Sequence, residues 1–202
     1  FDANLGSESI SLAAATLESD LGDMHAAAKL LMRAREEVRT ERVWITSVQV
    51  AWRQGAYDDA LTLAKNALER FPALEAVYTM QARLYETKGD LGAAREALAA
   101  GRRACPTSIM LWLLSSRLEE RTGALIRARA LLEKGRQAHP TSDELWAESA
   151  AVELRANSAA QAKTLLSRGL QACPSSGRLL SAAIWLEPRP ARKSRAADAL
   201  RR

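Results

Sequence analysis

The sequence predicts an all-α fold, an α-solenoid of stacked antiparallel helix pairs. Prolines recur at intervals of 34 residues, and large apolar residues and alanines recur with the same period. A fixed period of this length is typical of helix pairs that cannot bury their apolar faces alone and must stack on one another. Aromatic residues make up only 5% of the chain, and alanine, leucine, arginine and glutamate dominate. This composition favours helix over strand.

Three positions of the repeat carry the same kind of residue in successive units. The first is a proline, at Pro72, Pro106, Pro140 and Pro174. The second is a large apolar anchor, at Trp44, Tyr78, Trp112, Trp146 and Leu180. The third is an alanine 16 residues after each anchor, at Ala60, Ala94, Ala128, Ala162 and Ala196. We expect the tryptophan anchors to lie in the core, where burial of each ring contributes about 2 to 3 kcal/mol.

The clearest repeat predicts one helix over residues 107–121 and a second over 125–138. Thr107 or Ser108 supplies the helix N-cap, and Gly123 separates the two helices. The same turn position holds Gly55, Gly89 and Asn157, residues that tolerate a left-handed backbone. Small residues are expected where helices approach closely, at Val48, Ala82, Ser116, Ala150, Ala67, Gly101, Gly135 and Gly169.

The periodicity predicts a single repeat array over residues 1–202, with about five helix pairs and a partial sixth. The first unit has Ser11 at the anchor position, and the last replaces the glycine turn with EPRPAR. Neither end resembles a polar capping repeat, and solenoids need such caps to cover their terminal apolar faces. We therefore expect a fragment of a longer protein, with self-association possible through the uncapped ends.

Residues with the spacing of an active site are not evident. The two histidines, His25 and His139, lack partners at metal-ligand spacing, and no phosphate-binding loop or nucleophile elbow occurs. Cys105 and Cys173 occupy equivalent repeat positions and are expected to be free thiols. We predict a non-catalytic protein without a metal, a cofactor or a small-molecule substrate. No apolar run is long enough to span a bilayer, so no membrane contact is expected.

Positive charge gathers near the C-terminal end. The net charge is +5, and residues 175–202 hold seven basic residues against two acidic ones. A basic region of this kind attracts nucleic acid or an acidic partner, although a solvated helix face has the same composition. The candidate partner or RNA surface consists of Arg189, Arg192, Lys193, Arg195, Arg201 and Arg202.

The placement of Trp, Ala and Pro in a 34-residue period resembles the tetratricopeptide repeat (TPR). Glu119, Glu153 and Glu187 stand seven residues after their anchors, where that repeat usually has tyrosine. Glutamate at this position resembles the half-a-TPR, or HAT, repeat. The resemblance implies ion pairs between the two helices of a unit, Glu119 with Arg129 and Glu153 with Lys163. A partly buried pair of this kind fixes geometry more than it adds stability.

Four segments carry the resemblance further, namely SESISLAAATLES, RVWITSVQVAWRQG, LWLLSSRLEERTGALIRARALLEKGR and WLEPRPARKSRAADAL. They are similar to successive HAT units of a family of scaffolds of the spliceosomal tri-snRNP. The resemblance implies a nuclear protein-interaction scaffold in pre-mRNA splicing. Its implied partners are other spliceosomal snRNP proteins, with direct or indirect snRNA contact.

Two other functions remain open from the sequence. Direct RNA binding is suggested by arginines on successive second helices, although acidic residues interleave with them and no exposed aromatic platform is evident. These arginines are Arg95, Arg102, Arg103, Arg127, Arg129 and Arg136. A generic TPR adaptor for peptide termini needs a repeated set of Lys and Asn, and the chain offers Lys65 and Asn66 only once.

Overall fold

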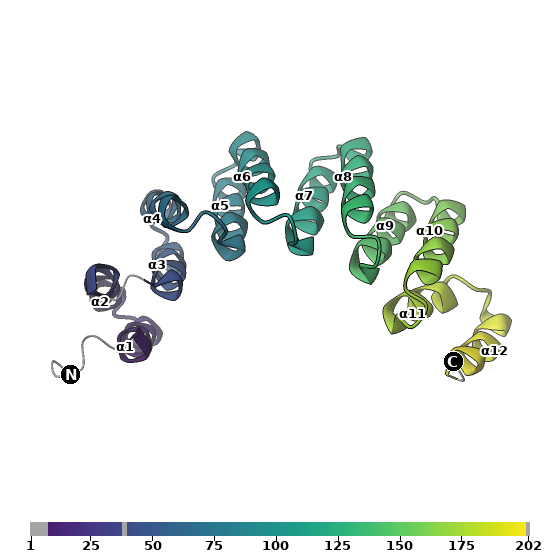
Figure 1. Cartoon of the computed structure of the whole chain (residues 1–202), viewed down its shortest axis with the longest axis horizontal. Helices are drawn as coiled ribbons and strands as arrows, with labels where there is room; N and C mark the ends of the chain where they lie inside the picture. The colour runs from purple at the N-terminus through teal and green to yellow at the C-terminus, as the bar shows by residue number, and fades with distance from the viewer. Residues whose placement is uncertain (1–7, 38–39, 201–202) are drawn as a thin grey trace. The chain divides into compact units, whose positions relative to one another are not determined.

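The computed structural model describes residues 8–37 and 40–200, and the side chains of all of these except residues 195 and 198–200. Within these residues the structure consists of helices and short loops, with no strand, which confirms the all-α prediction. Consecutive helices form antiparallel, TPR-like pairs (Figure 1). Two compact units divide the chain, Phe1–Pro106 and Thr107–Arg202. The single array over residues 1–202 stays a prediction.

Each unit holds six of the helices. The first contains α1 (Glu8–Leu21), α2 (Met24–Glu37), α3 (Glu41–Arg53), α4 (Tyr57–Arg70), α5 (Glu75–Thr87) and α6 (Leu91–Ala104). The second contains α7 (Ile109–Arg121), α8 (Leu125–Ala138), α9 (Asp143–Arg155), α10 (Ala159–Ala172), α11 (Gly177–Trp185) and α12 (Arg189–Leu200). Helix α11, with 9 residues, is shorter than the 13 residues of α7 and α9, because the chain leaves the helix before Pro188.

The recurring proline and serine mark where the first helix of a pair begins. The serine two residues after the proline is the N-cap, and its hydroxyl oxygen accepts a hydrogen bond from a backbone N–H of the first turn. The distances are 3.3 Å for Ser108, 3.4 Å for Ser142 and 3.2 Å for Ser176. Such a cap contributes about 1 kcal/mol. The structure selects Ser108 over Thr107 as the N-cap.

The turn inside each of the first five helix pairs holds a left-handed residue, which in the first pair is Gly22 with a φ angle of 89°. Gly55, Gly89 and Gly123 have φ angles of 75°, 80° and 78°, and Asn157 has a φ of 57°. Glycine and asparagine adopt this conformation at little cost, whereas other side chains clash with the backbone. The predicted turn positions are confirmed.

The most deeply buried column of the repeat is the residue just before the anchor. This residue is fully buried in five successive repeats, as Val43, Val77, Leu111, Leu145 and Leu179. The anchors themselves are less uniform, because Trp44 and Tyr78 are buried whereas Trp112, Trp146 and Leu180 are half-buried. The expectation that Trp112 and Trp146 lie fully in the core was therefore too strong, and in the last pair Leu179 takes the core position instead of Leu180.

A hydrogen bond ties two of the anchor rings to the repeat proline. Trp146 Nε1 donates to the carbonyl oxygen of Pro140 at 2.9 Å, and the Tyr78 hydroxyl donates to that of Pro72 at 3.1 Å. Both rings have an apolar body and a polar tip, and the bond gives the polar tip a partner. This bond links the proline and the anchor six residues apart.

Small residues let the helices approach closely, as predicted. A Cβ atom on Gly169 would lie 2.9 Å from Trp146 Cβ and 3.1 Å from Leu179 Cδ1. One on Gly135 would lie 3.2 Å from Leu145 Cδ2. The alanine column packs in the same way, with Ala60, Ala94, Ala128 and Ala162 fully buried and Ala196 half-buried.

Candidate interaction surfaces

Ion pairs connect two second helices, α8 and α10, to the repeat that follows each of them. Arg129 on α8 binds both carboxylate oxygens of Glu153 on α9, at 2.7 and 2.6 Å. Lys163 on α10 lies 3.5 Å from the Glu187 carboxylate, which follows α11. Glu153 is buried, and its hydrogen bond raises the pKa of Arg129 above its ordinary value. These pairs hold neighbouring repeats in register.

The partners expected from the sequence were wrong by one repeat. Arg129 pairs with Glu153 instead of Glu119, and Lys163 pairs with Glu187 instead of Glu153. Helices α8 and α10 each contact the first helix of their own pair and that of the next, and both neighbouring repeats carry glutamate at the same position. The sequence therefore offers two equivalent partners, and only the direction in which the basic side chain points decides between them.

Arginine side chains also cover the tryptophan anchors. The Arg136 guanidinium lies 4.8 Å from the centre of the Trp146 ring, and Arg35 and Arg70 lie 5.6 and 5.5 Å from the Trp44 ring. These contacts have cation–π geometry. Burial lowers the pKa values of Arg35 and Arg136 from their ordinary value. Arg129 and Arg136, two of the arginines considered for RNA binding, are thus engaged inside the fold.

A network of four charged residues connects α7 and α9. Arg155 binds both carboxylate oxygens of Glu120, at 2.6 and 2.8 Å, and also reaches Glu148 at 2.9 Å. Arg117 binds the other oxygen of Glu148 at 2.6 Å. Burial by itself would raise the pKa of Glu148, but the hydrogen bonds from Arg117 and Arg155 hold it below its usual value. The network neutralises this face of the two helices.

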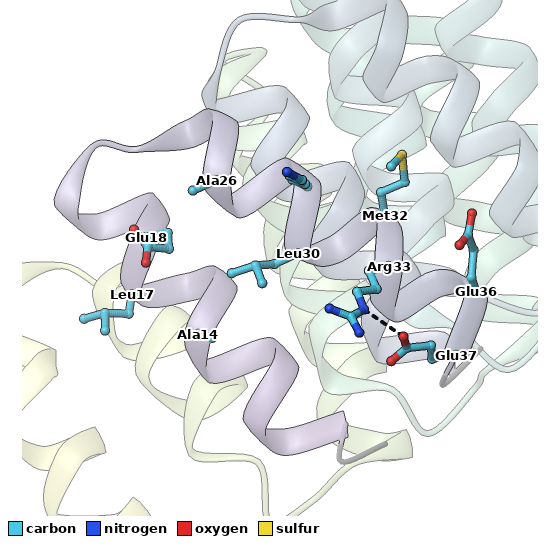
Figure 2. Close-up of a pocket in the computed structure, with 10 residues that line it drawn as sticks. Ala14, Leu17, Glu18, Ala26, Leu30, Met32, Arg33, Glu36 and Glu37 are labelled. Carbon is cyan, nitrogen blue, oxygen red and sulfur yellow. Dashed lines mark hydrogen bonds and ion pairs between the residues drawn. The ribbon is translucent and has the colours of Figure 1, made fainter. Parts of the chain in front are cut away.

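An open groove lies on the first helix pair, with a cavity volume of about 710 Å³ between α1 and α2 (Figure 2). Its apolar lining includes Leu17 and Met32, both exposed, and Leu17 has 58% of its surface open to solvent. Charged residues border it, with an ion pair of 2.8 Å between Arg33 and Glu37. The Glu18 carboxylate lines the same groove and makes no hydrogen bond or ion pair with any described residue. We call this site the first-pair groove.

Positions equivalent to those of the groove are covered in later repeats. Leu17 stands six residues after the anchor position, and Val50, Leu84 and Val152 at the same position are all buried. Glu18 is equivalent to Glu153, the partner of Arg129. The first-pair groove therefore exposes the face that an adjoining helix covers elsewhere. Sequence reasoning noted the missing cap but did not locate this groove.

The basic C-terminal surface divides into free and engaged residues. Arg189 and Lys193 on α12 are exposed. Arg192 instead donates hydrogen bonds of 2.9 Å to the carbonyl oxygens of Trp185 and Glu187, and its guanidinium lies 5.1 Å from the Trp185 ring centre. Arg192 is therefore a structural contact and not a free surface cation as expected. The side chain of Arg195, and Arg201 and Arg202 entirely, lie outside the described residues.

Trp185 is a surface residue that sequence reasoning missed, with 71% of its area exposed. The available signal was its place five residues after Leu180, since the same repeat position holds Gln49, Arg83 and Arg117 in three other repeats and Ala151 in a fourth. A column of mostly polar residues predicts a solvent-facing position.

Residues 8–37 and 40–200 hold no group of three metal-ligating side chains, and none of their helices combines the length and apolarity that crossing a bilayer requires. Cys105 and Cys173 are free thiols. Burial, with a smaller contribution from a nearby carboxylate, raises the pKa of each thiol, so both are weak nucleophiles at neutral pH.

Comparison with known proteins defines the class. Residues 51–118 match the tetratricopeptide repeat family. The structure is similar to yeast Tom70, with a TM-score of 0.63 and 20% identity over 95% of this chain and 41% of that one. It is also similar to a thermophilic TPR protein of Thermus thermophilus, with a TM-score of 0.55 and 20% identity over 89% and 98% of the two chains. The chain thus contains a TPR-like repeat region, a class that mediates protein binding.

One particular relative is similar in sequence. The pre-mRNA-splicing factor prp1 of Schizosaccharomyces pombe is 43% identical over 88 residues, which make up 44% of this chain and 10% of that protein. The match therefore spans about a tenth of the relative's length.

Proposed function

We propose that this chain is a non-catalytic protein-interaction scaffold of pre-mRNA splicing, a HAT-repeat relative of pre-mRNA-processing factor 6. In this role it helps assemble or bridge the spliceosomal tri-snRNP in the nucleus. The observation that carries the proposal is the 43% identity with the splicing factor prp1. The pairs Arg129–Glu153 and Lys163–Glu187 add support, because they use the glutamate typical of HAT repeats.

The first-pair groove is the proposed docking site for an amphipathic helix from outside these residues, in a partner protein or in a further repeat of the same protein. The occupant is an amphipathic helix that fills the apolar surface at Leu17 and places a lysine or arginine on Glu18. This chemistry follows from α9, where α8 supplies that cation as Arg129. A second copy of this chain fits less well. Its last helix has Ala197 at the repeat position of Arg129 and Lys163 and would leave Glu18 unpaired.

The test is affinity capture from nuclear extract, with and without ribonuclease, read by mass spectrometry. The baits are the wild-type chain, Leu17→Glu, and Ile126→Glu as a control at an exposed apolar residue of α8. We expect the wild type and the control to retain tri-snRNP proteins after ribonuclease treatment, and Leu17→Glu to lose them.

The outcomes separate the function from its site. Absence of splicing proteins from every bait contradicts the splicing role. If Leu17→Glu retains tri-snRNP proteins as well as the wild type does, the splicing role stands and the first-pair groove is ruled out as their docking site. A dimer in light scattering that Leu17→Glu abolishes assigns the groove to a second copy.

The TPR adaptor for peptide termini gains no support. Lys65 and Asn66 are exposed on α4, but the other repeats have no equivalent pair. Direct RNA binding is less well supported than the sequence suggested, because Arg129 and Arg136 make intramolecular contacts. The surface formed by Trp185 and the exposed cations of α12 still favours RNA binding.

A further inference from the structure

The repeat position of Trp185 faces solvent in three other repeats. It is exposed as Gln49, Arg83 and Arg117, and half-buried as Ala151. Leu17 differs, because four of its equivalents are buried, namely Val50, Leu84, Leu118 and Val152. Trp185 therefore places a large aromatic side chain at a position that is mostly exposed in the other repeats.

The indole is held in place by its surroundings. Arg192 stacks at 5.1 Å from the ring centre and binds the carbonyl oxygens of Trp185 and Glu187. Pro188 and Pro190 restrict the backbone between α11 and the first turn of α12. A ligand that stacks on a ring already fixed in this way loses less conformational entropy on binding.

Unpaired cations lie on the same side of α12 as the residue that touches the ring. Arg189, Arg192 and Lys193 have i, i+3, i+4 spacing, which places them on one helix face. Arg189 and Lys193 are exposed and make no ion pair with any described residue. The nearby carboxylate of Glu187 is already taken by Lys163. Arg189 lies in the first turn of α12, where the helix dipole repels a cation, so helix stability does not account for its place.

We propose that Trp185, Arg189 and Lys193 form a binding site for single-stranded RNA, with Arg192 positioning the indole. A base stacks on the exposed part of the ring, and Arg189 and Lys193 neutralise the flanking phosphates. An acidic peptide needs the cations but gains nothing specific from the indole, so the combination favours RNA. This site does not depend on the splicing role proposed above.

The test is fluorescence anisotropy of the purified chain with a labelled oligouridine of roughly ten nucleotides, within the usual site sizes. Loss of stacking in Trp185→Leu is expected to weaken binding by about 5- to 100-fold, and Trp185→Phe to restore most of it. The double variant Arg189→Gln/Lys193→Gln is expected to weaken binding and to reduce the slope of log K against log salt by roughly 1.4, or about 0.7 per phosphate.

The matched control is Arg103→Gln/Arg127→Gln, which removes two exposed arginines from α6 and α8. It is expected to keep the wild-type affinity, and circular dichroism checks that each variant is folded. Wild-type affinity in Trp185→Leu overturns the proposal. So does displacement of the RNA by an equal concentration of a polyglutamate peptide, which would assign the surface to acidic peptides. Both readouts are independent of the capture experiment.

Discussion

The same repeat positions have opposite environments in α1 and α9. Val152 and Glu153 on α9 are buried, and Glu153 holds the guanidinium of Arg129. Leu17 and Glu18 on α1 are their equivalents, yet Leu17 is exposed and the Glu18 carboxylate has no partner among the described residues. In a repeat stack, burial is a property of the neighbouring helix and not of the residue itself.

The largest expected effect separates two leucines at one repeat position. Leu84→Ala removes a fully buried side chain and is expected to lower the free energy of unfolding by about 2 to 5 kcal/mol. Leu17→Ala is expected to change it by less than about 0.5 kcal/mol. Urea titration followed by circular dichroism measures both. Equal losses would mean that another molecule covers α1 in solution.

Glycines give the next contrast. Gly169→Ala forces a methyl group against Trp146 and Leu179, and we expect a loss of about 1 to 3 kcal/mol. Gly177 is the first residue of α11, and a Cβ atom added there has open space around it. Gly177→Ala is therefore expected to be neutral or to stabilise the chain by up to about 1 kcal/mol. Thermal unfolding of the two variants measures the difference. A neutral Gly169→Ala would show that α9, α10 and α11 can separate at little cost.

The ion pair gives a smaller contrast. Glu153→Gln is expected to cost about 1 to 2 kcal/mol, because Arg129 loses a charged bidentate partner but remains partly solvated. Glu18→Gln is expected to have no measurable effect on the isolated chain. A double-mutant cycle with Arg129→Gln isolates the pair. A coupling energy near zero would mean that the contact between Arg129 and Glu153 contributes nothing to stability.

The smallest effect is pH-dependent and belongs to Glu148. Its pKa is lower in the folded chain than the ordinary 4.5, so its contribution is complete above that pH and is lost as the pH falls through the lowered value. Glu148→Gln is expected to remove roughly 0.5 to 1 kcal/mol of this acid dependence. Urea titrations between neutral and acid pH measure it, with Glu133→Gln on the exposed face of α8 as control. Parallel curves for Glu148→Gln and the wild type would contradict it.

Much of the fold could be predicted because its signals are local. The caps and turns depend on residues close in sequence, and Ser108, Gly123 and Asn157 lie where the pattern predicts. The interaction surfaces depend on which helix adjoins which. Arg129 had two equivalent glutamates within reach, and the choice of Glu153 required the orientation of α8 against α9. From the sequence, Arg192 was expected to be a surface cation, and only the tertiary structure shows its contact with Trp185.

The sequence by itself determined the period, the helix pairs and the places where helices approach closely, because each follows from propensity, capping and side-chain size within one repeat. The tertiary structure decided which identical positions are covered and which are open. It left Leu17 exposed and Glu18 without a partner among the described residues, buried Val152 and Glu153, and left Trp185 in solvent beside Arg192. The physical reason is that burial and ion pairing require the surface of a neighbouring helix. A periodic sequence repeats the same surface in each unit and does not specify which helix will adjoin it.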